Sequence, residues 1–388
     1  MANTLTNMIP DIYAAMDVVS RELVGFIPSV ARDSTADRVA AGQNLRIPIS
    51  PANTAGGNIT PAMALPAAAD QTIAPATLTI TKSRFFPFSW TGEEQKAMNT
   101  GIGYLTLQQS QIAQAIRAAV NEIEADIATA AYKAASRAYG AAGTTPFNTT
   151  PGDYSDAAQL RKILADNGAP LSDLTLVMNT AAGAAVRGKQ AQAQMLGSDS
   201  LQRNGILLDI NGFALRESAQ VPTVTAGTMA SATSTSAAFT VGQTVIPLAT
   251  AGTGVVAAGD VVTFANDANQ YVVKAVSFAG ANPASGDSIT LTAPGLRVAQ
   301  GVATRTITVT ATAARNVGFN RNAILLATRL PALPIEGDMG KSLEVTDPYS
   351  GLSFEVATYP GYRMNLYQVL VCWGVTVIRP EHAAILLG

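Results

Sequence analysis

The strongest constraint in this sequence is a single helical pattern that runs from about Tyr104 to Tyr139. Apolar side chains recur there three or four residues apart, at Ile112, Ile116, Val120, Ile123, Ile127 and Ala131. At about 1.5 Å per residue, such a helix would be on the order of 50 Å long, which exceeds the width of a small globular domain. We therefore expect a spine helix that other parts of the chain pack around.

The segments before this helix differ from it and from each other. Residues 11–27 carry one apolar stripe that predicts an N-terminal helix, formed by Ile12, Ala15, Met16, Val19, Leu23 and Phe26. Residues 40–90 are rich in Pro, Gly, Ala and Thr and contain short alternating runs, which predicts strands that flank a long loop. A loop of that length with no core of its own is more plausible as an arm that packs on a neighbouring molecule. Thr91 and Glu94 have the spacing of a capping box and predict a short helix that ends at Gly101 and Gly103.

The segments after the spine predict two further kinds of structure. In residues 153–220 we expect an α/β alternation, with a helix at Ser155–Asp166, a buried strand at Leu174–Met178 and a helix capped by Asn179 or Thr180. Residues 221–314 are rich in Thr, Val, Ala and Gly with frequent turn signals, which predicts a small all-β unit, a sandwich or a barrel. Residues 319–388 return to mixed strands and turns.

Composition limits the classes of function. The chain is 48% hydrophobic, only 13% charged and has a formal net charge of -2. Such a surface is expected to face other protein, and the charge argues against tight binding to nucleic acid, which requires clustered basic residues. The single cysteine, Cys372, excludes an intramolecular disulfide and is expected to be buried. Because the sequence shows no signal peptide and no apolar run long enough to cross a bilayer, we expect a protein made in a cytoplasm that has no membrane partner.

Catalytic chemistry finds little support in the sequence. The only histidine, His382, lies near the C-terminus and is expected to be solvated or hydrogen-bonded. The acidic groups at Glu93-Glu94 and at Glu122, Glu124 and Asp126 are expected to be solvated helix charges. We predict no catalytic, cofactor-binding or metal-binding residues.

One motif imitates a phosphate-binding loop. Gly183 to Lys189 matches the first seven positions of that motif, but Gln190 stands where a Ser or Thr would bind magnesium. The glycines are explained more simply by a helix that starts at Asn179 or Thr180 and stops at Gly188.

The order of these segments, together with several sequence stretches, resembles the major capsid proteins of tailed bacteriophages. The subgroup most similar to this chain comprises the coat proteins of short-tailed phages of enteric bacteria that carry an inserted β-barrel domain. The most specific stretches are AAGDVVTFANDANQYVVKAVSFAG, SITLTAP, NRNAILLATRLPALP and LYQVLVCWGVTVIRPEHAAILLG. Weaker similarity lies in AVNEIEADIA and LTLVMNTAAG.

The resemblance implies an α+β fold of the tailed-phage capsid type with an inserted all-β domain. It divides the chain into an N-terminal arm helix (1–35), an extended loop with flanking strands (36–90), a peripheral domain with the spine helix (91–150, completed by parts of 315–388), an axial α/β domain (151–220 and 315–388) and an inserted β-barrel domain (221–314).

The resemblance also implies a function and partners. The chain would assemble with itself as pentamers and hexamers into an icosahedral head that encloses double-stranded DNA, in the cytoplasm of a bacterial host. A scaffolding protein would guide assembly, a portal protein would occupy one vertex, and the packaged DNA would be contacted weakly. No cofactor is implied.

Four residues are candidate contacts under this resemblance. Arg46, Asp70 and Lys82 are the charges of the arm that would reach over a neighbouring subunit, and their alternative role is that of solvated loop charges. Asp17, on the N-terminal helix, is a candidate contact for the basic end of a scaffolding protein.

One departure concerns the inserted domain. Related proteins carry a charged loop there that bridges capsomers, but residues 221–259 of this chain contain no charge. We therefore expect this region to contact the α/β domain that it interrupts.

Two other classes of function remain as alternatives. A carbohydrate-binding or adhesive surface protein would explain the Thr-rich β unit and the low charge, but not the spine helix or the arm. An enzyme is the third alternative, and the shortage of histidine argues against it.

Overall fold

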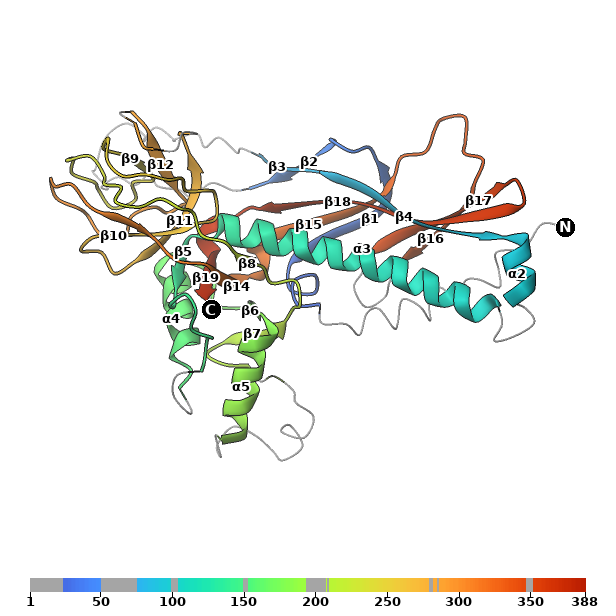
Figure 1. Cartoon of the computed structure of the whole chain (residues 1–388), viewed down its shortest axis with the longest axis horizontal. Coiled ribbons are helices and arrows are strands. Elements are labelled where there is room, and N and C mark those ends of the chain that lie inside the picture. Colours follow the sequence, from blue (N-terminus) through green and yellow to red (C-terminus); the bar gives the residue numbers. More distant parts are fainter. Residues whose placement is uncertain are drawn as a thin grey trace, which may run out of the picture.

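The computed structural model describes residues 24–49, 75–98, 104–148, 153–192, 207, 209–278, 282–284, 286–346 and 352–388. The molecule is elongated, and a long helix runs along one face of a sheet, with a β-rich unit at one end (Figure 1). The predicted α+β class is confirmed, and so is an all-β unit within the second half of the chain.

The long helix is α3, Tyr104–Ala134. Every member of the predicted apolar stripe from Ile112 to Ala131 is buried, which confirms the spine. The helix ends five residues before the predicted end at Tyr139, because Arg137–Tyr139 form strand β5, which pairs in parallel with β19 (Ala383–Leu387). Pairing with a distant strand thus overrides the local helical pattern.

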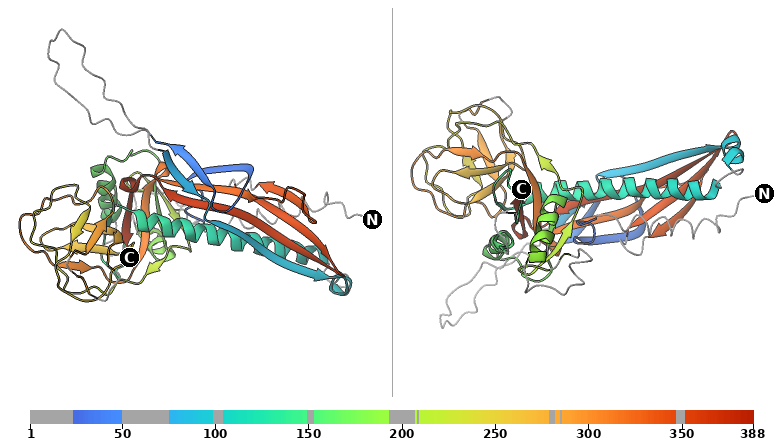
Figure 2. Two further views of the ribbon diagram at one scale, coloured as in Figure 1. Left: turned by 90° about the horizontal axis from the view of Figure 1, so that it is seen from above. Right: turned by 60° about the horizontal axis from the view of Figure 1, so that its bottom comes forward.

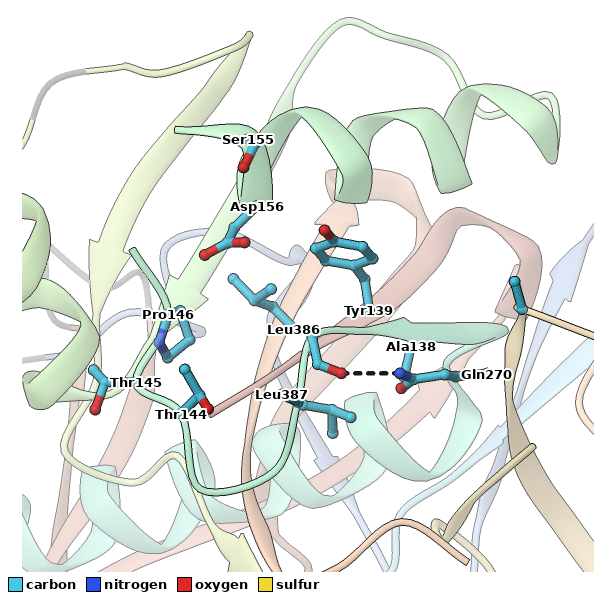
Figure 3. Close-up of a pocket in the computed structure, with 13 residues that line it drawn as sticks. Ala138, Tyr139, Thr144, Thr145, Pro146, Ser155, Asp156, Gln270, Leu386 and Leu387 are labelled. Atoms are coloured by element: carbon cyan, nitrogen blue, oxygen red, sulfur yellow. Dashed lines mark hydrogen bonds between the residues drawn. The ribbon is translucent and has the colours of Figure 1, made fainter. Parts of the chain in front are cut away.

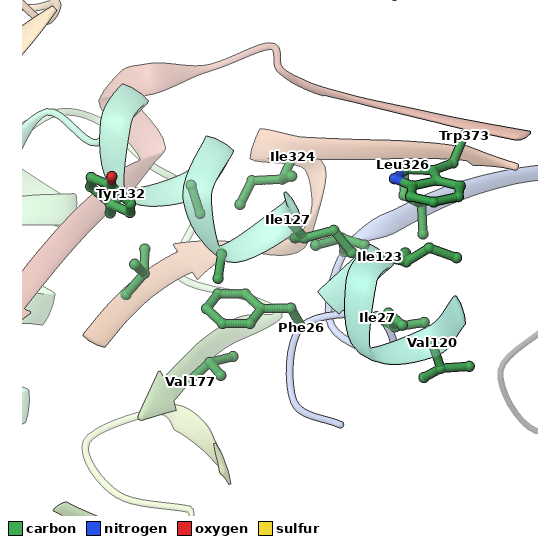
Figure 4. Packing of buried hydrophobic residues seen from close by; sticks show 14 of the residues in the cluster. Phe26, Ile27, Val120, Ile123, Ile127, Tyr132, Val177, Ile324, Leu326 and Trp373 are labelled. Atoms are coloured by element: carbon green, nitrogen blue, oxygen red, sulfur yellow. The ribbon is translucent and has the colours of Figure 1, made fainter. Parts of the chain in front are cut away.

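α3 packs against a sheet built mostly from the C-terminal part of the chain. Its strands follow the order β1 (Ala31–Val39), β15 (Ile324–Pro331), β18 (Met364–Val377), β17 (Ser353–Gly361) and β16 (Lys341–Thr346), and β4 (Lys82–Thr91) pairs with β18. Figure 4 shows Ile123 and Ile127 of α3 against Ile324, Leu326 and Trp373 of this sheet. Burying each such side chain contributes about 1.5–3 kcal/mol, so this contact is a major source of stability.

The segment before β1 differs from its prediction. The predicted N-terminal helix lies largely outside the described residues, but its last part, residues 24–27, is described and is not helical. The backbone N–H groups of Gly25, Phe26 and Ile27 donate to the side chain of Glu124 in α3 instead of to carbonyls of a helix. Phe26 and Ile27 are buried in the core beside α3 (Figure 4).

The α/β part consists of α4 (Ser155–Asp166), β6 (Leu174–Met178), α5 (Thr180–Gln192) and β7 (Phe213–Glu217). The predicted bounds of α4 and β6 are confirmed. Asn179 Oδ1 accepts a hydrogen bond from the Ala182 N–H at 2.9 Å, which caps α5 as predicted. α5 does not stop at Gly188 but continues to Gln192, so that prediction is wrong, and both glycines of the apparent phosphate-binding motif lie inside a helix.

The α/β elements belong to a second sheet that continues into the all-β unit. Its main path is β13 (Ile307–Val309), β10 (Val261–Phe264), β11 (Gln270–Val276), β5, β19, β14 (Ala313–Asn320), β6 and β7. β8 (Thr223–Val224) pairs with β14, while β12 (Ser288–Leu291) joins β11 to β9 (Val245–Pro247). Backbone hydrogen bonds join residues 232–234 to residues 305–307 at β13, and residues 233–235 to residues 247–249 at β9. This segment therefore bridges the two end strands, β13 and β9, and closes the strands of the unit into a ring.

Two smaller elements complete the fold. β2 (Asn44–Pro48) and β3 (Pro75–Thr79) pair with each other and form the base of the predicted arm. α2 (Gly92–Met98) starts with the predicted capping box, since the Thr91 N–H donates to Glu94 and the Glu94 N–H donates to Thr91 Oγ1. Figure 2 shows the arm base rising beside the long sheet. Short 3-10 turns at Arg321–Ala323 and Pro380–His382 precede β15 and β19.

The two glycines of α5, Gly183 and Gly188, provide a matched test of how α5 packs against β7. A Cβ at Gly183 would overlap the carboxyl group of Glu217, whereas a Cβ at Gly188 would meet nothing within 4 Å. We expect Gly183→Ala to lower the free energy of unfolding by about 1–3 kcal/mol through overpacking. Gly188→Ala should raise it by up to about 1 kcal/mol, because alanine favours a helix interior. Thermal and denaturant unfolding would measure both changes, and equal effects of the two substitutions would contradict this account.

Candidate functional site

The described part of the chain offers no constellation of catalytic or metal-binding groups. No group of three or more His, Cys, Asp or Glu side chains lies there in an arrangement that could hold a metal ion. A hollow of about 410 Å³ lies where the α/β part meets the all-β unit (Figure 3). Its one carboxylate, Asp156, accepts the Phe147 N–H at 2.8 Å, and Gln270 donates to the Gly140 carbonyl at 2.9 Å. Both groups hold loops in place, so the hollow carries no paired acid and base.

Lys82, a predicted contact between subunits, has partners in its own chain. Its ammonium group lies 3.0 Å from Glu122 and 2.9 Å from Asp126, both on α3, and 5.6 Å from the ring centre of Trp373. Trp373 also donates its indole N–H to Asp126 at 2.8 Å. These contacts join β4, β18 and α3 at one point, which fixes the start of β4 against the spine.

The electrostatics of this cluster favour the charged forms. Burial by itself lowers the pKa of Lys82, but hydrogen bonds and charge interactions with Asp126 and Glu122 outweigh it and leave that pKa raised. Burial by itself raises the pKa of Glu122, but hydrogen bonds and charge interactions with Lys82 and Arg84 outweigh it and leave that pKa lowered. The surroundings of Lys82 and Glu122 therefore favour the charged form of each.

Glu124 is a second anchor on α3, and its side chain is buried. Its carboxylate accepts the backbone N–H groups of Gly25 and Phe26 at 2.7 Å and of Ile27 at 2.9 Å. Burial raises the pKa of Glu124, while these three donors oppose that shift because they favour the carboxylate. Since both oxygens accept, the hydrogen-bond pattern is that of the ionised group.

The expectation that Glu124 is solvated is therefore wrong. A signal for its burial exists in the sequence, since Glu124 lies four residues after Val120 and three before Ile127 and thus on the apolar face of the helix. Glu122 and Asp126, which were expected to be solvated, are partly buried in ion pairs with Lys82.

The other predicted contact residues are distributed as follows. Arg46 lies on β2 and is exposed. Asp70 and Asp17 lie outside the described residues. The structure does not bring Arg46 and Lys82 together in one site, and the roles assigned to the four residues stay predictions.

The remaining singled-out side chains are structural. Cys372 is buried and free, and burial raises the pKa of its thiol. Burial lowers the pKa of the half-buried His382. Among the described residues, no helix is both long and apolar enough to cross a membrane.

A buried charged group lies where three parts of the chain meet. Arg315 of β14 is fully buried, and its guanidinium nitrogens have no hydrogen-bond partner in the described part of the chain. The charge of Asp260, at the turn into β10, and Tyr132 of α3 act on it and oppose the lowering of the Arg315 pKa by burial. The charge interaction with Asp260 offsets part of the cost of burying this arginine at the junction.

Comparison with known proteins gives likeness in structure only. No protein-family profile matches the sequence, and no curated protein matches it. A structure titled as the capsid of the cyanophage P-SCSP1u is 12% identical, with a TM-score of 0.48 over 92% of this chain and 86% of that chain. The capsid of a native GTA particle is 10% identical, with a TM-score of 0.46 over 95% and 90%. A virus-like particle from Pyrococcus furiosus is 9% identical, with a TM-score of 0.44 over 97% and 98%.

Glu124→Gln tests the anchor of residues 25–27. An amide supplies one acceptor oxygen instead of two and places an N–H group opposite a backbone donor, so we expect a loss of about 2–3 kcal/mol in the free energy of unfolding. Hydrogen exchange of the amides of residues 25–27 should accelerate. Glu93→Gln, at an exposed position on α2, is the control and should change stability by less than about 0.5 kcal/mol. Unchanged exchange at residues 25–27 in Glu124→Gln would contradict the anchor.

Proposed function

We propose that this chain is the major capsid protein of a tailed bacteriophage and that it assembles with itself into the icosahedral head that encloses the double-stranded DNA genome. In this proposal the subunits form pentamers and hexamers, and the protein is a structural component of the virion and not an enzyme. The subtype that we propose carries an inserted β-barrel domain and is that of short-tailed phages of enteric bacteria.

The observation that carries the proposal is the shape of the chain together with its apolar surface. A helix of 31 residues lies along a long sheet with an arm base beside it, which gives an elongated plate and not a rounded enzyme with a central cleft (Figures 1 and 2). Large apolar side chains are exposed at both ends of this plate, among them Val302 in the β unit and Ile335 beyond β15. Where such side chains cluster, as Ile335 does with Met339, they are typical of surfaces that associate with protein.

The low charge supports the same proposal. Among the described residues, eight charged side chains are buried, including Glu124, Arg137, Arg315, Arg329 and Glu355. Most of the described charged side chains lie on the surface, but the surface is still poor in charge because only 13% of the whole chain is charged. Interface cores are depleted of charge, so a subunit with several neighbours is expected to have such a surface. The same property fits a shell whose inner wall contacts DNA weakly.

The domain assignment follows the buried clusters of the fold. The peripheral domain would comprise residues 91–150 with parts of 315–388, and the axial domain residues 151–220 with 315–388. Residues 221–314 would form the inserted domain, residues 36–90 the extended loop and residues 1–35 the N-terminal arm. One buried cluster lies almost wholly within residues 147–215 and a second within residues 229–307, which supports the axial and inserted units.

The partners and their residues remain part of the proposal. A scaffolding protein would guide assembly in the cytoplasm of a bacterial host, and a portal protein would occupy one vertex. Arg46 and Asp70 are the proposed arm contacts with a neighbouring subunit. Lys82 already pairs with Glu122 and Asp126 of its own chain, so its substitution would also disturb the fold. Arg46 is therefore the better residue to substitute in a test of the arm contact.

Co-expression tests the proposed assembly. The full chain should be produced alone and with the product of the adjacent upstream gene, the proposed scaffolding protein, and the particles examined by electron microscopy. We expect closed shells of uniform size with the second protein present. Small soluble oligomers under every condition would overturn the proposal.

Asp17→Ala tests the scaffold contact separately. If Asp17 meets the basic end of the scaffolding protein, the yield of scaffold-dependent shells should fall while the melting temperature of the chain stays unchanged. A normal yield would remove this residue from the proposed contact and leave the assembly proposal intact.

A further inference from the structure

A loop between β15 and β16 presents large apolar side chains to solvent. It spans residues 332–340 and rises above the long sheet in Figure 1, where it is drawn in orange. Ile335 is 105% exposed and Met339 is 87% exposed. We call this segment the apolar loop. Together with the partly exposed Leu333, these two side chains form a group of exposed apolar side chains on one loop, which makes the loop a candidate surface for contact with protein.

The loop is held in a defined conformation by the sheet beneath it. The Tyr359 hydroxyl of β17 donates to Asp338 at 2.6 Å, and the Gly337 N–H donates to the Pro334 carbonyl at 3.0 Å. A Cβ at Gly340 would lie 2.5 Å from the Tyr359 ring, so only glycine lets the loop come this close to the strand. The apolar side chains are thus presented outward by internal contacts.

A groove lies at the same end of the molecule. It has a volume of about 640 Å³ and is formed where the turn between β17 and β18 meets the start of α2. Its lining includes Trp90, Gly361, Tyr362, Arg363 and Met364. The Gly92 N–H donates to the Arg363 carbonyl at 3.0 Å, which fixes the turn against α2. We call this hollow the tip groove.

The apolar loop and the tip groove are complementary in charge as well as in polarity. The loop carries Glu336 beside Ile335, and the groove carries Arg363 beside Met364 and Trp90. Within the described residues, neither Glu336 nor Arg363 forms an ion pair. Glu93 also lines the groove and would repel an acidic loop, so the complementarity is local to Arg363, the one basic residue among the described residues of the lining. Because Ile335 is fully exposed, the loop does not fill the groove of its own chain.

We infer that the apolar loop of one copy of this chain docks in the tip groove of a second copy, with Ile335 in the groove and Glu336 beside Arg363. This inference rests on the proposed self-assembly and names one of its contacts. The two surfaces differ, so the contact is heterologous, and its repetition closes a ring only where the rotation between subunits closes.

The contact is small and acts as one of several. A single loop buries far less than the roughly 1,000 Å² that a stable interface of two proteins requires. In a closed shell, however, each subunit is already held near its neighbours by other contacts, which makes the docking effectively intramolecular. We therefore expect the contact in assembled particles and not between isolated subunits.

Disulfide trapping tests the pairing directly. Ile335→Cys and Met364→Cys would be made separately in the full chain, and the native Cys372 does not interfere because it is buried. Shells assembled from a mixture of the two variants and mildly oxidised should contain a disulfide-linked dimer, whereas shells of either variant alone should contain only monomers. Dimers from Ile335→Cys alone would mean that loop meets loop, and shells without the mixed dimer would mean that the loop does not reach the groove; each outcome overturns the inference.

Exchange of the two charges tests the electrostatic part. Glu336→Arg and Arg363→Glu should each place like charges at the contact and reduce the yield of closed shells by about tenfold, the effect of about 1.4 kcal/mol per contact. The double variant should restore the yield. Both side chains are exposed, so the melting temperatures of the unassembled variants should match that of the original chain and serve as the control for folding. A double variant as defective as the single ones would overturn the pairing.

These experiments separate the inference from the proposed function. If the unaltered chain forms no shells with the proposed scaffolding protein, self-assembly as a capsid is wrong. If it forms shells but the mixed dimer and the restoration are both missing, only the contact between apolar loop and tip groove is wrong.

Discussion

The burial of the apolar stripe of α3 is the constraint on which the rest of the structure depends. One continuous cluster of buried residues surrounds this stripe, and it takes members from the segment before β1, from β10 and β11 of the β unit, from β14 and β19, and from the long sheet. A helix of 31 residues cannot bury such a stripe within one small domain, so parts from distant regions of the sequence converge on it. The α/β part, the β unit and the long sheet therefore all contribute to this cluster, although the α/β part and the β unit also have buried clusters of their own.

The charges of α3 serve the same purpose as its apolar stripe. Asp126 binds both Lys82 of β4 and the indole of Trp373 in β18, while Glu124 binds the backbone of residues 25–27. Buried or half-buried charges of this kind fix the register of strands and segments that apolar contact alone would allow to slide.

Much of the fold could be predicted from local patterns, and the failures share one physical cause. The spine, α4, β6 and the capping box of α2 follow from periodicity and capping residues, which depend on neighbours in the sequence. The end of α3, by contrast, is set by pairing with β19, more than two hundred residues away. Gly188 was expected to end α5, but it lies inside the helix, which continues to Gln192. At residues 25–27, the backbone N–H groups donate to Glu124 instead of to helix carbonyls. Each error arose where a distant partner or an unbroken helix prevailed over a local signal.

The candidate contacts show the same limit. Lys82 was singled out as an arm charge, but only the fold shows that two acids of α3 lie beside it. Ile335 and Met339 lie in a stretch, RLPALPIEGDMG, that looks like an ordinary turn-rich loop, and nothing local distinguishes exposed from buried apolar residues there. Their exposure depends on Tyr359, which holds Asp338, and on the close approach of Gly340 to its ring.

The attachment of the β unit shows how an insertion can be accommodated without loss of rigidity. Val224 at its entrance pairs with Ala313 at its exit, so the two connections lie side by side and the insertion adds little distance between the strands that it interrupts. A second attachment is the pairing of β11 with β5, supported by the hydrogen bond from Arg137 to Asn269 at 3.0 Å. Residues 222–224 lie within the region from which sequence reasoning expected contacts with the α/β domain, and they do contact β14, whereas the contact of residues 269–271 with β5 was not expected. Two separate lines of pairing resist rotation in a way that a single hinge does not, so the β unit supports the end of the spine where Gly259 packs on Tyr132.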